Sequence, residues 1–150
     1  MILKGTHTVK APCEKVWEAL NRPEILMRAT PGCKRLVVNA AGGYDTELEV
    51  GVGAIKGRFT GTIEIKDRVP GSQYHLAVSA NGNAGFLNAE GLVDLKENGG
   101  ETQIDYAGQA QIGGPIASVG QRMAEGVAKR LVVQFFRNFE EALNTEGMSE

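Results

Sequence analysis

The middle of the chain alternates between apolar and polar side chains, which predicts a series of β-strands. In the segment 44–54, Tyr44, Thr46 and Leu48 face one side, and Asp45 and Glu47 face the other. The same period of two recurs in four later segments: 59–66, 74–78, 87–95 and 102–112. A further strand is expected before them, over 34–40, which carries Leu36, Val37 and Val38. Short turns rich in glycine, proline and asparagine separate these segments, so consecutive strands are expected to pair antiparallel.

Both ends of the chain differ from this pattern. A strand is expected over 2–10, followed by a short helix that opens at Pro12 and ends at Pro23, and by a second short helix around 25–27. From Pro115 to Leu143, apolar residues recur every three or four positions, which predicts one helix of about 29 residues and roughly 43 Å. The order is therefore strand, two short helices, six strands and one long helix.

Half-polar strands need a cover on one face, and the predicted long helix is the element with the length to provide it. We therefore expect an α+β protein with a seven-stranded antiparallel sheet bent around that helix. The chain has 20 glycines, and fifteen of them lie between 42 and 114. Glycines inside strands let a sheet bend, and they leave space under the helix for a cavity. The candidates are Gly51, Gly53, Gly57, Gly61, Gly91 and Gly108.

The order of these features resembles the CoxG-like family of carbon monoxide dehydrogenase subunits, within the Bet v 1/START-like (SRPBCC) superfamily of helix-grip folds. The resemblance spans almost the whole chain. The matching residues are Ala11-Pro12 with Val16-Trp17 and Leu20, Pro23-Glu24 with Leu26, Pro31-Gly32-Cys33, the run Val50-Gly51-Val52-Gly53 through Lys56-Gly57, Phe59 and Gly61, then Gly113-Gly114-Pro115, Gly120, Arg122 and Phe135-Phe136.

This resemblance implies a single helix-grip domain over 1–144 with a polar tail over 145–150. It also implies a non-catalytic accessory protein that binds an apolar small molecule, lipid or quinone-like, beside a molybdenum-containing dehydrogenase. Some family members continue into a membrane-anchoring tail. This sequence ends at Glu150 with a polar stretch, so attachment through such a tail is not expected. We expect a cytoplasmic location, with peripheral contact at the inner face of the membrane as the alternative.

Composition excludes several other classes. Sixteen Lys and Arg against eighteen Asp and Glu give a net charge of −2, which argues against a nucleic-acid-binding protein. No apolar run approaches the roughly 18 residues of a membrane span, and no signal peptide is evident. Two cysteines, Cys13 and Cys33, are too few for a disulfide scaffold and fit a reducing compartment.

Candidate chemistry is sparse, and no catalytic residue, metal site or cofactor is predicted. His7 and His75 are expected to be exposed or hydrogen-bonded strand residues, and no Cys or His spacing matches a zinc site. Cys13 near a helix start could be a reactive thiol, although a plain packing residue is the better interpretation. The strand carboxylates and the cations of the long helix fit solvated faces.

The predicted cavity would be lined by apolar residues of the covered faces. The buried hydroxyl of Tyr106 would need a partner, either a ligand carbonyl or a backbone group or water. Two alternatives remain open: an aromatase/cyclase-like enzyme acting on a polyketide or aromatic substrate, and an interaction protein with a filled core. The predicted lining residues are Met27, Leu48, Val50, Phe59, Ile63, Leu76, Ala89, Tyr106, Val119, Met123 and Val127.

Overall fold

The fold is known from a computed structural model that describes residues 1–52 and 55–148. Gly53 and Ala54, predicted as strand residues, lie outside the described residues, as do the last two residues of the chain. The elements follow the predicted order. They are β1 (Ile2–Val9), α1 (Cys13–Leu20), α2 (Pro23–Ala29), β2 (Cys33–Val38), β3 (Tyr44–Val52), β4 (Ile55–Val69), β5 (Gln73–Gly82), β6 (Gly85–Asn98), β7 (Glu101–Gly113), the 3₁₀ helix η1 (Pro115–Val119) and α3 (Gln121–Met148).

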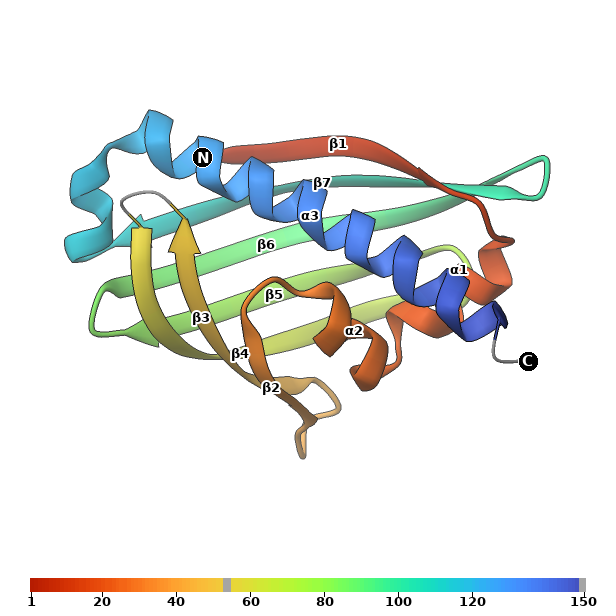
Figure 1. The fold of residues 1–150 in the computed structure, drawn as a ribbon, viewed down its shortest axis with the longest axis horizontal. Coiled ribbons are helices and arrows are strands. Elements are labelled where there is room, and N and C mark those ends of the chain that lie inside the picture. Colours follow the sequence, from red (N-terminus) through yellow and green to blue (C-terminus); the bar gives the residue numbers. More distant parts are fainter. Residues whose placement is uncertain (53–54, 149–150) are drawn as a thin grey trace.

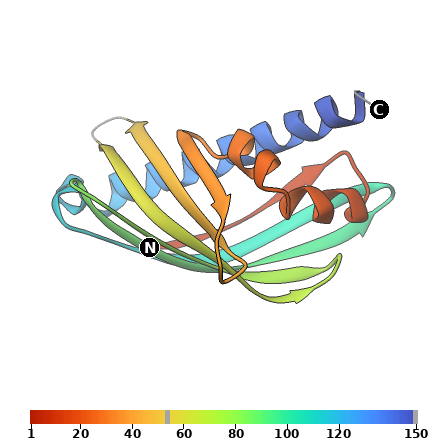
Figure 2. The same ribbon diagram turned by 90° about the horizontal axis from the view of Figure 1, so that it is seen from below.

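The strands form one antiparallel sheet of seven, in the order β1-β7-β6-β5-β4-β3-β2. Sequence neighbours pair through short turns, and β1 closes the other edge by pairing with β7. At the β4–β5 turn, Ser72 N–H donates to the Val69 carbonyl at 2.9 Å and Gly71 has φ of 77°, the geometry that a Pro-Gly turn favours. The sheet curves around α3, which runs diagonally across it (Figures 1 and 2). The predicted helix-grip architecture is confirmed.

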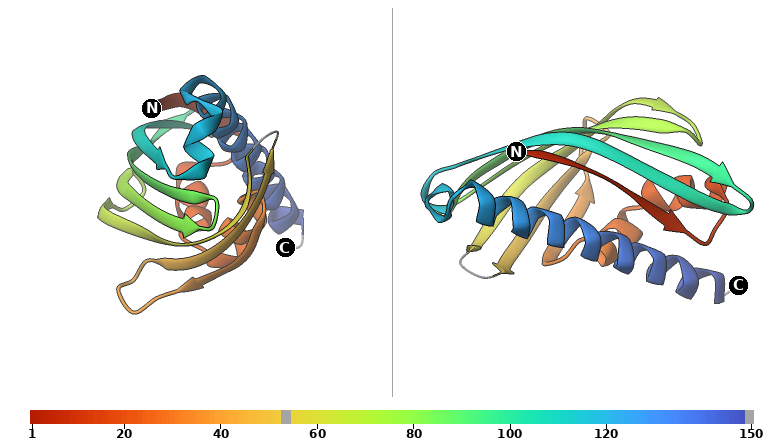
Figure 3. Two further views of the ribbon diagram at one scale, coloured as in Figure 1. Left: turned by 90° about the vertical axis from the view of Figure 1, so that its left-hand side faces the viewer. Right: turned by 90° about the horizontal axis from the view of Figure 1, so that it is seen from above.

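The face of the sheet that α3 covers is called the inner face here. Its residues follow the predicted alternation, since Tyr44 and Thr46 are buried whereas Asp45 and Glu47 are exposed. The views along and above the sheet show α1 and α2 at the end where α3 finishes, and η1 at the end where α3 begins (Figure 3). Pro12 precedes α1 and Pro23 is the first residue of α2, positions at which a missing N–H costs the helix nothing.

The long helix is where the sequence prediction was wrong in detail. Pro115–Val119 forms a separate 3₁₀ helix, and α3 begins only at Gln121. Gly120 lies between them with φ of 93°, a conformation that interrupts a right-handed helix. At the other end α3 continues to Met148, beyond the predicted end at Leu143. The apolar stripe marked some buried positions, among them Val127 and Phe139, but it also included the exposed Met123 and did not mark where the helix begins or ends.

Most buried apolar side chains fall into two separate clusters under α3, whereas Leu36, Tyr44 and Ala110 are buried outside both. The α1–α2 cluster joins both short helices and the last turns of α3 to the sheet: Val9, Cys13, Val16, Ala19, Leu20, Ile25, Ala29, Tyr74, Leu95, Ile104, Phe136, Phe139, Ala142 and Leu143. The η1 cluster lies where α3 begins: Ile55, Phe59, Ala80, Ile116, Ala124 and Val127. A stretch of the inner face between them belongs to neither cluster.

Candidate functional site

The candidate site is the apolar inner surface between the two clusters. Ile63, Val78 and Ala89 are cross-strand neighbours on β4, β5 and β6, so they form one row across the middle of the sheet. All three share the phase of buried inner-face residues, yet each is only half-buried and joins neither cluster. These three apolar residues of the covered face therefore lie outside both packed clusters, in a row that ends at the buried Tyr44 and Ala110.

The other predicted lining residues divide between the two ends of this surface. Leu48, Val50, Phe59, Val119 and Val127 all lie in or against the η1 cluster. Leu76 and Tyr106 pack against the α1–α2 cluster. The structure thus brings these residues to the two sides of the row on β4–β6, although whether they line a cavity stays a prediction.

Met27 and Met123 are placed differently. Their exposed fractions are 39% on α2 and 49% on α3, and neither belongs to the two clusters. Ala124, next to Met123, is the buried residue of that helical turn. The sequence missed Ala124 because a small side chain gives little signal in an apolar stripe. A lining role for the two methionines also stays a prediction.

The glycines predicted to leave space are not equivalent. Leu76 pairs with Gly91 and Gly91 pairs with Gly108, so the three form one inner-face row across β5, β6 and β7, beside the row that Ala89 occupies. Gly51 is exposed and has the phase of Glu49 on the outer face, so it leaves no room under α3. Gly53 lies outside the described residues.

Tyr106 points toward the inner face and lies across β1. Its ring stacks on Phe136 of α3, with centroids 5.4 Å apart. Gly5 is its cross-strand neighbour, and a Cβ at Gly5 would lie 2.5 Å from the Tyr106 hydroxyl oxygen. The phenol therefore occupies the space that a side chain on β1 would take, which explains a glycine at this strand position.

His7 differs from the expectation that it would be exposed or hydrogen-bonded. Its Nε2 is the one buried side-chain nitrogen or oxygen without a hydrogen-bond partner in the described part of the chain. The ring stacks on Phe136 at 5.1 Å, and Nε2 lies 3.8 Å from Oε1 of Glu140. Sequence reasoning missed this group because its partners are on α3, at the far end of the chain. His75 is exposed and contacts Asp67 at 3.0 Å, as expected.

Tyr44 and Tyr74 lie at the α1–α2 end of the inner face, and both phenols are uncharged. Burial raises the pKa of Tyr74 well above its ordinary value, and the neighbouring Tyr44 adds to the shift. Burial also raises the pKa of Tyr44. The Tyr44 hydroxyl is 3.5 Å from the Asn21 carbonyl, and Tyr74 meets Trp17 edge-to-face. Both phenols therefore stay protonated at neutral pH and act as packing residues of low polarity.

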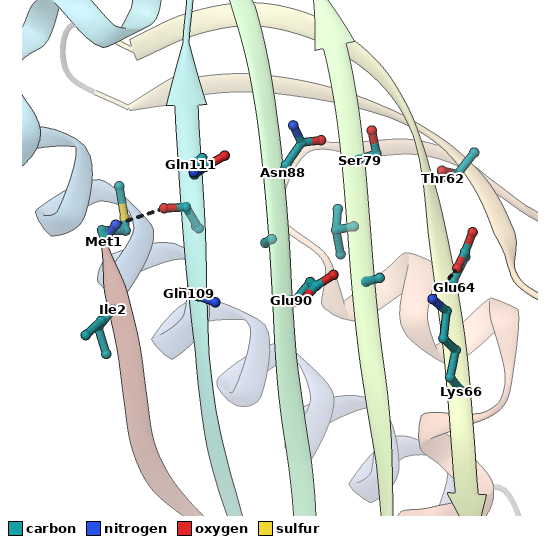
Figure 4. A pocket seen from close by; sticks show the side chains of 14 residues that line it. Met1, Ile2, Thr62, Glu64, Lys66, Ser79, Asn88, Glu90, Gln109 and Gln111 are labelled. Atoms are coloured by element: carbon teal, nitrogen blue, oxygen red, sulfur yellow. Dashed lines mark hydrogen bonds and ion pairs between the residues drawn. The ribbon is translucent and has the colours of Figure 1, made fainter.

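The outer face of the sheet carries a cleft of different character, with a volume of about 620 Å³. Rows of polar side chains cross it, and Figure 4 shows Thr62, Ser79, Asn88 and Gln111 side by side. Charged side chains also line it, including Glu90 and the ion pair between Glu64 and Lys66 at 3.1 Å. The lining of this cleft combines these charged and polar side chains with apolar residues such as Ile2 and Ala77, so it suits an apolar ligand less well than the inner face does.

The described residues contain no group of three His, Cys, Asp or Glu side chains placed to hold a metal ion. Of the helices in the described residues, none combines the length and apolar character needed to cross a membrane. Cys13 is buried in the α1–α2 cluster, whereas Cys33 is half-buried beside the Thr46 hydroxyl at 3.6 Å. The inner face therefore combines apolar side chains with the phenols of Tyr44, Tyr74 and Tyr106 and the imidazole of His7.

Comparison with known proteins agrees with this geometry. The sequence profile of the CoxG family of carbon monoxide dehydrogenase subunits matches residues 5–144. A conserved protein from Geobacillus kaustophilus of known structure is 37% identical, with a TM-score of 0.93 over 97% of this chain and 96% of that one. No protein with a curated description matches significantly.

More distant solved structures share the fold. A START superfamily protein from Mycobacterium smegmatis is 13% identical, with a TM-score of 0.72 over 96% of this chain and 97% of that one. The Zhui aromatase/cyclase from Streptomyces sp. R1128 is 18% identical, with a TM-score of 0.67 over 96% and 93%. At these identities the likeness concerns the architecture alone.

Proposed function

Because the chain belongs to the CoxG family of carbon monoxide dehydrogenase subunits, we propose that it binds an apolar small molecule between the sheet and α3. The observation that carries this proposal is the row Ile63, Val78 and Ala89, which lies on the covered face and packs in neither core cluster. A protein whose core was filled would bury such a row, since interiors pack to the density of organic crystals.

A ligand in this place would gain chiefly from the hydrophobic effect. Covering about 100 Å² of apolar surface contributes about 2.5 kcal/mol. Immobilising the ligand opposes this gain, so a ring system must cover both the row and a face of α3 to bind tightly. The phenol of Tyr106 stands at the edge of this surface and offers one hydrogen-bond donor. A lipid or a quinone-like molecule, largely apolar with one or two carbonyl oxygens, fits that combination.

The family match supports an accessory role. We propose that the bound molecule is carried to or from a molybdenum-containing dehydrogenase, in the cytoplasm or at the inner face of the membrane. No catalytic residue and no cofactor of the protein's own are needed for such a role. Native mass spectrometry of the purified protein, with organic extraction of what is released, tests the proposal directly. A stoichiometric lipophile is expected.

A pair of variants locates the site. Ala89→Phe places a ring on the inner face, within the proposed site, and should abolish ligand retention. Ser79→Phe adds the same ring to the exposed outer face of β5 and should leave retention intact. Equal retention by both variants would contradict the inner-face location, and a protein that retains no lipophile and binds none would favour the interaction protein with a filled core.

One observation favours an enzyme as the second candidate. A phenol and an imidazole, from Tyr106 and His7, both contact Phe136 at one wall of the inner face. Such a pair could transfer protons during cyclisation of a polyketide or aromatic substrate. Turnover that depends on pH and is lost in Tyr106→Phe would establish this alternative.

A further inference from the structure

Along the outer face of the sheet, several polar side chains pair with one another outside the cleft of about 620 Å³. Thr6 and Gln103 donate hydrogen bonds to the Asp105 carboxylate at 2.7 and 3.0 Å. The His75 ring contacts the Asp67 carboxylate at 3.0 Å. The polar atoms of these side chains therefore find partners within the protein.

Polar side chains inside the cleft differ, because they are left without partners in the described part of the chain. Asn88 and Gln111 are cross-strand neighbours on β6 and β7, and Figure 4 shows both side chains on the cleft, yet no hydrogen bond joins their amides. Their donors and acceptors are therefore available to a ligand. The polar lining side chains that make no hydrogen bond and no ion pair within residues 1–52 and 55–148 are Thr62, Ser79, Asn88, Glu90, Gln109 and Gln111.

The cleft is a trough with short side chains along its middle strand. On β5, Ala77 lies between Glu64 of β4 and Glu90 of β6 in one cross-strand row, so its methyl group is flanked by two longer side chains. The next row runs from Thr62 on β4 to Gln111 on β7 and crosses four adjacent strands. At about 4.8 Å between strands, that row extends over about 14 Å. The trough is therefore long enough for a ligand of more than one small ring.

The charges that line the cleft balance one another. Lys66 pairs with Glu64 at 3.1 Å, and the Met1 ammonium donates to the Ala110 carbonyl at 2.8 Å. These two cations are matched by the carboxylates of Glu64 and Glu90. Since no net charge attracts an ion, the unpaired amides and hydroxyls decide which ligand fits. Such groups both donate and accept, which favours a neutral ligand that does the same.

An aromatic ring lies beside the polar row. Phe86 is 40% exposed on β6, two residues before Asn88, and it lines an adjoining cleft together with Gln111. A Cβ on Gly113, its cross-strand neighbour, would collide with the Phe86 ring, so the ring lies over the backbone of β7. The exposed part of the ring is therefore held in place at the end of the row, where it can receive a flat apolar surface.

We propose that the outer-face cleft is a second binding site, which takes a neutral oligosaccharide. Each sugar hydroxyl donates one hydrogen bond and accepts others, which matches the amides and hydroxyls in the row from Thr62 to Gln111. The C–H face of a terminal sugar ring packs on the exposed part of Phe86. This cleft and the surface beneath α3 are on opposite faces of the sheet, so the site is independent of the proposed function.

An NMR titration tests the proposal. The probe is cellotriose, a neutral trisaccharide of β-1,4-linked glucose, added to the ¹⁵N-labelled full chain. The side-chain amide signals of Asn88, Gln109 and Gln111 should shift together, whereas backbone amides of α1 and α2 should not. An open cleft that exchanges water for sugar hydroxyls gains little from each hydrogen bond, so we expect a Kd of about 1 mM.

Variants at exposed positions locate the site with little risk to folding. The double variant Asn88→Ala, Gln111→Ala removes two amides from the row and should raise the Kd about tenfold. Phe86→Leu removes the aromatic face and should raise it about threefold to tenfold. Asn144→Ala removes an exposed amide on α3 that makes no hydrogen bond within the described residues, so it is the matched control and should keep the wild-type Kd.

Three results would overturn the oligosaccharide site. The first is the absence of any shift up to about 20 mM cellotriose, about twentyfold above the expected Kd. The second is a set of shifts confined to residues beneath α3, because the trisaccharide would then occupy the inner face. The third is a double variant that binds cellotriose as tightly as the wild type. None of these results bears on the lipophile that native mass spectrometry is expected to detect.

Discussion

Phe136 is the residue on which the attachment of α3 to β1 depends. Its ring is 7% exposed and contacts three other aromatic rings, those of His7, Tyr106 and Phe135, at 5.1, 5.4 and 5.2 Å. Phe136→Ala removes all three contacts and leaves a cavity between helix and strand. The flanking backbone of β1 and α3 is hydrogen-bonded within its own elements, so it cannot collapse fully into this space.

The expected cost is large for a domain of this size. Removal of a buried phenylalanine ring lowers the free energy of unfolding by about 3–5 kcal/mol, and we expect about 4 kcal/mol here. A whole domain has about 5–15 kcal/mol, so the variant should stay folded at 25 °C and melt about 8–16 °C below the wild type.

Urea unfolding followed by circular dichroism measures this directly. The midpoint should shift while the slope m stays unchanged, because the area exposed on unfolding is almost the same. Phe86→Ala is the control: this ring is 40% exposed and covers Gly113, so its removal should cost about 1 kcal/mol. A Phe136→Ala cost no larger than that of Phe86→Ala would refute the role given to the ring stack.

Three further predictions concern other contacts of β1 and β7. Gly5→Ala should cost about 1–3 kcal/mol, because its methyl group meets the Tyr106 hydroxyl oxygen; the double variant with Tyr106→Phe should regain part of this in urea unfolding. Thr102→Val should cost about 1–3 kcal/mol by the same assay, because its fully buried hydroxyl donates a 2.7 Å hydrogen bond to a main-chain carbonyl that would be left unpaired. Hydrogen bonds from Thr6 first, then from neighbouring side chains, lower the pKa of Asp105 below its ordinary 3.8, so its contribution to stability is present above that pH and is lost as the pH falls through the lowered value. Thr6→Val should raise the pKa of Asp105 toward 3.8 in an NMR titration, and an unchanged titration curve would contradict the assignment.

Most of the architecture could be predicted because its signals are local. The alternation of Tyr44, Thr46 and Leu48 with carboxylates identified both the strand and the face that is covered, and the burial of Tyr44 and Thr46 agrees. Pro12 and Pro23 are also local signals, because each marks the start of the short helix beside it. From the order of the elements, the only predicted helix long enough to cover the bent sheet was the one at the end of the chain.

The limits of the long helix could not be predicted from its apolar stripe. The apolar spacing continues across Gly120, where the structure has a break between η1 and α3. Spacing indicates which side of a helix a residue faces, and it does not indicate whether the backbone between two such residues is helical. Spacings of four also exceed the 3.6 residues of a turn, so the stripe drifts about 40° per step. Met123 lies four steps before Phe139, about 160° away, which accounts for its exposure while Phe139 is fully buried.

The sequence by itself determined the order of elements and the inward phase of the alternating strands, because these depend on neighbours within a few residues. Only the tertiary structure decided which distant groups meet. The His7 ring and the Lys10 N–H meet Phe136 and Glu140 across about 130 positions of sequence, and the Tyr106 phenol lies over Gly5. It also decided that the core divides into two clusters with an apolar row between them, because that outcome depends on how closely a helix and a curved sheet can approach.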